Sequence, residues 1–186
     1  MSRELSREAY TSLFGATEGD RVRLGDTNLL AEIETDHTTY GDEAVFGGGK
    51  TMRDGMGMQP GTTQAEGALD WVYSNVVLID PVLGVQKGDL GVRNGEVAGF
   101  GKAGNPDTMD GVDENLVIGP STDAVPADGL IATPGAFDIH VHFNSKELFE
   151  HALASGVTTM MGGGYGGGAT TCTPGPENIK RFLQAA

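Results

Sequence analysis

The chain has 186 residues, of which 38% are apolar, and this is enough to bury the core of one domain or slightly more. Acidic residues outnumber basic ones by 26 to 12, and the net charge of −14 makes nucleic acids and anionic membranes poor partners. One cysteine excludes an internal disulfide framework, while a charged amino terminus and the lack of a long apolar run predict a soluble, cytoplasmic protein.

The acidic residues are dispersed along the chain, and only five lysines accompany them. This composition favours a halophile-like protein that stays soluble in concentrated salt, where counterions screen the repulsion between like charges. An ordinary acidic cytoplasmic protein is the alternative. We expect the two to differ in how their stability responds to salt.

The first predicted element is a short helix over residues 6–14, with Ser6 as its N-cap and Gly15 as its stop. Strands follow it. Residues 21–24 alternate arginine with apolar side chains, and residues 29–33 form a second short apolar stretch. The chain is therefore predicted to change from helix to strand after Gly15.

Residues 47–67 are rich in glycine, methionine and threonine and show no periodicity, which predicts an irregular loop. The loop begins with Gly47-Gly48-Gly49-Lys50-Thr51, which ends like a phosphate-binding P-loop. The first glycine of that motif would fall at Ala44, however, and no helix-forming stretch follows Thr51. We therefore expect no nucleotide site there.

A strand over residues 71–79 and a β-hairpin are the clearest signals in the middle of the chain. Residues 90–93 and 96–100 flank Asn94-Gly95, the dipeptide that favours a two-residue type I′ turn. Residues 1–130 are therefore predicted to form a β-rich domain.

Strands and helices alternate in the last part of the chain. A strand reaches His142, and helix 146–154, strand 157–161 and helix 176–186 follow it. Two β-α units in succession imply parallel strands, and two parallel strands bury too little core to stand alone. Residues 131–186 are therefore expected to be the start of a larger domain, inside which the chain ends.

His140 and His142 close the apolar run of residues 130–139 and are the candidate metal ligands. Side chains on a strand alternate between its faces, so both imidazoles point the same way, about 6.6 Å apart along the strand. In a barrel of parallel strands, the carboxyl ends of the strands face the active site. Two histidines make only part of a site, because zinc, nickel or iron takes further nitrogen or carboxylate ligands. Two surface histidines without a metal are the plain alternative.

A run of glycines from Gly162 to Gly168, interrupted only by a tyrosine, follows the second of these strands, at the same end as His142. Such a run lets backbone approach a ligand closely or serves as a flexible connector, and its location favours contact with the site. Cys172 has no histidine near it in the sequence, so we expect a small packed residue there and not a nucleophile.

From about Arg7 to Ala186 the chain resembles the amino-terminal third of the large, catalytic (alpha) subunit of urease, in the amidohydrolase superfamily. That superfamily shares the Asp-x-His-x-His element, whereas the glycine-rich blocks are specific to urease. The segments that carry the resemblance are Arg21 to Thr27, Phe46 to Lys50, Arg53 to Gly57, Gly101 to Asp107, Ala154 to Met160 and Ala169 to Pro176.

The resemblance implies a β-rich amino-terminal domain followed by the first two β-α units of a truncated (β/α)8 barrel of the TIM type. It also implies that His140 and His142 bind one of two nickel ions. In that family, nickel polarises the urea carbonyl and activates the water that attacks it, which yields ammonia and carbamate. The backbone carbonyl of Ala169 is implied to accept a hydrogen bond from urea.

The resemblance further implies beta and gamma companion subunits, a trimeric assembly, and accessory proteins that deliver nickel. The family's bridging lysine, its other metal ligands and its catalytic histidine have no match in this chain. We therefore expect no catalytic residue within it, and no urea hydrolysis by this polypeptide alone. Two alternatives stay open: another metal-dependent amidohydrolase that acts on cyclic amides, and a non-catalytic remnant that retains subunit contacts.

Overall fold

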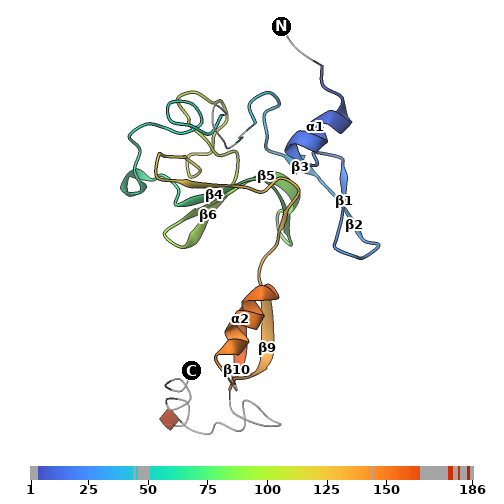
Figure 1. The fold of residues 1–186 in the computed structure, drawn as a ribbon, viewed down its shortest axis with the longest axis vertical. Helices are drawn as coiled ribbons and strands as arrows, with labels where there is room; N and C mark the ends of the chain where they lie inside the picture. Colours follow the sequence, from blue (N-terminus) through green and yellow to red (C-terminus); the bar gives the residue numbers. More distant parts are fainter. Residues whose placement is uncertain are drawn as a thin grey trace. The chain divides into compact units, whose positions relative to one another are not determined.

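A computed structural model describes residues 4–43, 45, 51–143 and 145–163, and single positions at 176, 177, 180 and 184. The chain forms two compact units, residues 1–133 and 134–186 (Figure 1). The first unit is β-rich, as predicted for the amino-terminal domain, and residues 134–143 and 145–163 of the second unit combine a helix with two strands. None of the described helices is long and apolar enough to cross a membrane.

The first unit opens with helix α1, Arg7–Phe14, which begins and ends where the sequence predicts. The Ser6 hydroxyl accepts a hydrogen bond from the Ala9 N–H at 3.2 Å, and this satisfies one of the free donors of the first helical turn. Gly15 ends the helix with a φ of 79°, a conformation that glycine adopts without strain.

Two short strands follow as a small separate hairpin. Strand β1, Arg21–Arg23, pairs antiparallel with β2, Leu30–Glu32. An exposed ion pair of 2.8 Å joins Arg21 to Glu32 across the hairpin. Strand β3, Thr35–Asp36, was not predicted from the sequence. It is the first strand of the main sheet of the unit.

The described part of the predicted irregular loop, residues 51–67, contains turns and one short 3-10 helix, η1, Gln64–Glu66. The Thr63 N–H donates to the Glu66 carboxylate at 2.9 Å and so caps this helix. Residues 46–50, which hold the P-loop-like glycines, lie outside the described part of the chain.

A six-stranded sheet organises the first unit. Its central strand β4 pairs antiparallel with β5 and parallel with β7 and β8, and β5 pairs in turn with β3 and β6. Besides β3, the strands of this sheet are β4, Trp71–Asp80; β5, Gly84–Arg93; β6, Glu96–Gly101; β7, Asp123–Pro126; and β8, Ile131–Ala132.

The predicted hairpin turn is present between β5 and β6. Asn94 and Gly95 both have positive φ, 55° and 77°, as a type I′ turn requires. The Asp70 carboxylate accepts a hydrogen bond from the Asn94 N–H at 2.6 Å, and this fixes the turn next to the start of β4.

A cluster of buried apolar side chains packs against this sheet. The side chains of Leu69, Val72 and Leu116 are fully buried in one cluster, and each contributes about 2 kcal/mol by leaving water. Gly91 of β5 leaves room for them, because a Cβ there would lie 2.5 Å from Leu116 and 2.8 Å from Leu69. On the other face of β4, Trp71 remains 44% exposed.

A β-bulge interrupts β4, and a buried carboxylate of β5 holds it. The pairing register shifts between Tyr73 and Val76, and Asn75 within the bulge has a φ of 58°. The Asp89 carboxylate accepts the N–H of Asn75 at 3.0 Å and the N–H of Ala103 at 2.8 Å. Asp89 therefore ties together β4, β5 and the segment that follows β6.

Two lysines of the first unit are buried. The Lys87 ammonium donates to the Phe14 carbonyl at 2.6 Å and lies 4.0 Å from the Asp36 carboxylate. Burial lowers the pKa of Lys87, and the Asp36 carboxylate opposes this shift. The Lys102 ammonium has three acceptors, which belong to Thr39, Asp42 and Asp110. The buried carboxylates of Asp36, Glu43 and Asp89 accompany these cations, so charges of both signs are buried in this unit.

We expect the midpoint of thermal unfolding to rise as KCl increases from about 0.1 M to above 1 M. The Debye length falls from about 10 Å to about 3 Å over this range, and repulsion between surface carboxylates is screened accordingly. Circular dichroism melts at a series of KCl concentrations measure the effect. A midpoint that stays constant or falls would contradict the high-salt hypothesis and favour an ordinary acidic protein.

The second unit is a β-α-β segment (Figure 1). It consists of β9, Ala136–His142, helix α2, Glu147–Ala154, and β10, Val157–Gly163. Strands β9 and β10 pair in parallel, as predicted, and α2 coincides with the predicted helix over residues 146–154. Apart from Pro176, Glu177, Lys180 and Gln184, which are helical, the predicted last helix lies outside the described residues.

The apolar run over residues 130–139 is two strands and not one. Strand β8 joins the first sheet, whereas β9 belongs to the second unit and begins only at Ala136. Pro134 has no N–H to offer a strand ladder, and Gly135 weakens strand formation, so the run breaks there. The predicted strand that reaches His142 is present as β9.

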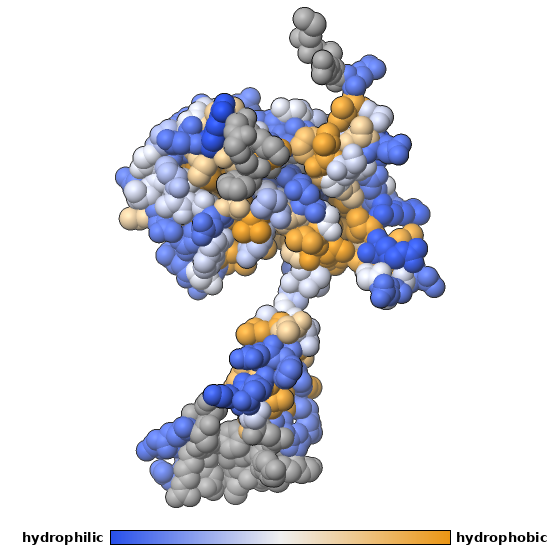
Figure 2. Space-filling view, viewed as in Figure 1, coloured by the Kyte–Doolittle hydropathy of each residue, from blue (hydrophilic) through white to orange (hydrophobic). Residues whose placement is uncertain are grey.

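Strand β9 is also not the buried strand that its apolar sequence suggests. Val141 is 8% exposed, but Phe137 and Ile139 are 69% and 74% exposed. Figure 2 shows hydrophobic surface, in orange, on the described part of this unit. Within the described structure, β9 pairs with one strand, β10, along one of its two edges. Helix α2 packs against β10. A strand covered in this way keeps much of its apolar surface in water.

Candidate metal site

The candidate site lies at the carboxyl end of β9. His140 and His142 alternate with the buried Val141, so both imidazoles leave the strand on the face opposite to the valine. The two ring centroids are 5.4 Å apart, and the ring planes are inclined by 43°. The structure therefore brings together the two side chains that the sequence singles out.

Asp138 shapes the strand just before this pair. Its carboxylate accepts a hydrogen bond from the His140 N–H at 3.0 Å. Two residues apart on a strand, Asp138 and His140 share a face, so a negative charge stands beside the imidazoles. This charge favours a bound cation. This positioning role of Asp138 was not predicted from the sequence.

The donor chemistry of the pair fits nickel, although it is incomplete. His140 is exposed and His142 is only partly buried, so a ligand can reach their rings. Neutral imidazole is a good ligand for nickel, zinc, copper and iron alike. Among the described residues, no group of three histidine, cysteine, aspartate or glutamate side chains could hold a metal ion. The pair therefore supplies part of a ligand set.

The remaining two histidines occupy other places. His37, in the first unit, has its Nε2 atom 2.9 Å from the Gln86 side-chain oxygen. His151 lies in the last turn of α2, with an exposed side chain. The candidate site thus depends on a single strand.

Strand β10 brings glycines alongside the histidines. The parallel register pairs Gly162 with Val141 and Gly163 with His142. A Cβ at Gly162 would lie 2.7 Å from the carbonyl carbon of Val141 and closer still to the carbonyl oxygen, so a larger residue does not fit. The first glycines of the run that begins at Gly162 therefore allow the two strands to pair at the site.

The substitution Gly162→Ala is expected to push β10 away from β9. Overpacking against rigid backbone costs about 1–3 kcal/mol, and amide hydrogen exchange in both strands should quicken accordingly. Gly99→Ala is the matched control, because its Cβ would meet Leu116 at an ordinary 3.4 Å. Equal exchange rates in wild type and Gly162→Ala would show that the close approach is not required.

Ala169, Cys172 and the later glycines of the run, Gly164 to Gly168, lie outside the described part of the chain. The backbone contact from Ala169 to urea and the packed state of Cys172 therefore stay predictions.

Two imidazoles on one face of a parallel strand, in a chain that also contains a β-rich unit, define a candidate metal-binding protein of mixed α and β structure. Residues 3–125 match the protein family described as urease alpha-subunit, N-terminal domain. The chain belongs to this family.

Curated relatives extend the similarity over the whole chain. Over all 186 residues, it is 86% identical to urease subunit alpha of Haloquadratum walsbyi, 80% identical to that of Natronomonas pharaonis and 69% identical to that of Haloarcula marismortui. These alignments cover 33%, 33% and 32% of the respective relatives. The chain thus spans about a third of the length of the curated relatives it matches, and His140 and His142 lie within the aligned region.

Proposed function

We propose that this chain is the amino-terminal part of the catalytic subunit of a urease, which hydrolyses urea to ammonia and carbamate in the cytoplasm with two nickel ions. The observation that carries the proposal is the pair His140 and His142, side by side at the end of a parallel strand in a chain of the urease alpha-subunit family. The high identity to three urease alpha subunits over this same segment supports it.

In this proposal His140 and His142 hold one of the two nickel ions. When bound, nickel supplies Lewis-acid polarisation of a carbonyl oxygen and lowers the pKa of water. The chain's own residues position the ligands: Asp138 fixes the backbone of His140, and Gly162 keeps β10 close to β9. The backbone carbonyl of Ala169 is proposed to accept a hydrogen bond from a urea amide.

We also propose that β9 and β10 are the first two strands of a (β/α)8 barrel. The parallel pairing of these strands around helix α2 supports this, because it is the repeating unit of such a barrel. The exposed apolar side chains of Phe137 and Ile139 support it as well, since further strands and helices would cover them.

The proposed partners are beta and gamma urease subunits, accessory proteins that deliver nickel, and further copies of the subunit in a trimeric assembly. The relatives' shared name, urease subunit alpha, supports the presence of companion subunits.

The test is a chimera in which this chain replaces the matching first third of the Haloquadratum walsbyi subunit. We expect nickel-dependent ammonia release from the chimera and none from the 186-residue polypeptide, because two ligands on one strand do not complete a site. A folded, nickel-loaded chimera that leaves urea intact would overturn the proposal. Turnover of hydantoin in place of urea would instead identify a cyclic-amide hydrolase, and ammonia release by the short chain would refute its predicted inactivity.

A further inference from the structure

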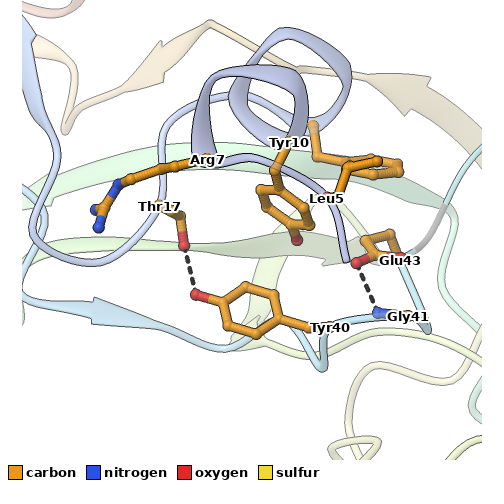
Figure 3. Close-up of a pocket in the computed structure, with 8 residues that line it drawn as sticks. Leu5, Arg7, Tyr10, Thr17, Tyr40, Gly41 and Glu43 are labelled. Atoms are coloured by element: carbon orange, nitrogen blue, oxygen red, sulfur yellow. Dashed lines mark hydrogen bonds between the residues drawn. The ribbon is translucent and has the colours of Figure 1, made fainter. Parts of the chain in front are cut away.

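A pocket of about 590 Å³ lies between helix α1 and the segment Tyr40 to Glu43, in the first unit (Figure 3). It is distinct from the histidine pair, which belongs to the second unit. The residues that line it are Leu5, Arg7, Tyr10, Phe14, Thr17, Tyr40, Gly41 and Glu43.

Three aromatic rings form much of the pocket wall. The Tyr10 ring centroid lies 5.0 Å from that of Phe14 and 5.1 Å from that of Tyr40, and Tyr40 meets Tyr10 edge-on. Tyr40 is nevertheless 64% exposed, and Leu5 at the rim is 53% exposed. Large apolar side chains that line a hollow and stay in water are typical of a surface that another molecule covers.

The charge at the pocket is negative. The Glu43 side chain is only 9% exposed, and its carboxylate accepts the Gly41 N–H at 2.7 Å (Figure 3). The cation at the rim, Arg7, is already paired with the Asp20 carboxylate at 2.8 Å and donates to the Glu18 carbonyl at 2.6 Å.

Lys87 is the second cation close to the pocket, and several carboxylates surround it. The Lys87 ammonium lies 5.6 Å from the centroid of the Tyr10 ring. Four carboxylates act on this lysine, and they belong to Asp36, Asp128, Glu43 and Asp89. The region therefore carries an excess of negative charge that a bound cation would offset.

The Tyr10 hydroxyl adds a polar group to the wall of the pocket. Its oxygen is buried beside the Glu43 carboxylate. Burial raises the pKa of Tyr10, and the neighbouring Glu43 and Asp36 carboxylates add to this, so the hydroxyl keeps its proton.

We propose that this pocket receives a short segment of another polypeptide that inserts an arginine or lysine beside an apolar side chain. Aromatic faces and a carboxylate together recognise an alkylammonium or guanidinium group. One such group fills only part of about 590 Å³, and the part lined by Leu5 and Phe14 suits the apolar neighbour. The proposal does not depend on urea hydrolysis.

The probe is the dipeptide N-acetyl-leucyl-arginine amide, and its matched control carries citrulline, a neutral analogue of arginine with nearly the same shape. Both are titrated into the ¹⁵N-labelled chain at the lowest salt that keeps it folded. We expect the amide signals of Gly41 and Glu43 to shift and saturate at millimolar arginine peptide. Glu43→Gln should weaken binding at least fivefold, whereas Glu18→Gln, an equal loss of charge outside the pocket, should leave it unchanged.

The proposal is overturned if the arginine peptide causes no shifts at these amides, if the citrulline peptide binds equally well, or if Glu43→Gln binds like wild type. Nuclear Overhauser contacts from the rings of Tyr10 and Tyr40 to the chain's own residues 44–50 would also overturn it, because the occupant would then be internal. Unchanged chemical shifts outside the pocket in Glu43→Gln confirm that this variant is folded.

Discussion

Replacing His142 by alanine in the chimeric urease is expected to lower the rate of ammonia release roughly 10³-fold, which corresponds to about 4 kcal/mol of lost transition-state stabilisation. The physical reason is that His140 and His142 form one binding surface, with ring centroids 5.4 Å apart, and neither imidazole alone holds an ion firmly. We expect His140→Ala to behave in the same way and the double variant to lose little more. Steady-state ammonia release and nickel content per subunit are the measurements.

His151→Ala is the matched control for these variants. It removes an imidazole from the same β-α-β unit, but from the exposed last turn of α2. We expect nickel content and activity to stay close to those of the unsubstituted chimera. If His142→Ala keeps its nickel while activity falls, the histidine acts on the reaction and not as a ligand.

The second large effect is expected at Asp89. Asp89→Ala leaves the N–H groups of Asn75 and Ala103 buried without their acceptor, and each such loss costs about 1–3 kcal/mol. We expect the free energy of unfolding to fall by about 3 kcal/mol or more, because the β4 bulge loses its tie to β5. Denaturation with guanidinium chloride at constant high KCl measures the change. A loss below about 0.5 kcal/mol would contradict the account of the bulge.

The pH dependence of stability provides a second test of the role of Asp89. Burial raises the pKa of the Asp89 carboxyl to about 6, and hydrogen bonds from Ala103 and Asn75 limit the rise. Between the ordinary aspartate pKa near 4 and this value, the folded state binds more protons than the unfolded state. The contribution of Asp89 protonation to the free energy of unfolding is therefore fully present below about pH 4 and is lost as the pH rises through about 6.

A variant isolates this pH effect from the titration of the many other carboxylates. In Asp89→Asn the side chain cannot ionise, so the stability difference between wild type and variant should shift in favour of wild type by up to about 3 kcal/mol from pH 7 to pH 4. A difference that does not change with pH would show that Asp89 has an ordinary pKa.

Local signals in the sequence predicted local structure well. Ser6 and Gly15 bound helix α1 because capping involves only neighbouring backbone groups. Asn94-Gly95 produced the expected turn because both residues tolerate positive φ.

Features that depend on distant residues were not predicted. Strands β3 and β7 are too short to show a periodicity, and their partners β5 and β4 lie far away in the sequence. Lys87 and Asp89 look like ordinary surface residues of a strand, yet both are buried, and only the folded chain supplies their partners. At the candidate site, strand alternation predicted that the imidazoles of His140 and His142 share a face, whereas further ligands cannot be inferred from two residues.

Anomalous diffraction at the nickel absorption edge, from crystals of the nickel-loaded chimera, tests whether His140 and His142 hold nickel in a urease subunit. We expect an anomalous peak about 2.1 Å from one ring nitrogen of each histidine. A nickel peak bound elsewhere, with the imidazoles of His140 and His142 free of metal, would contradict it.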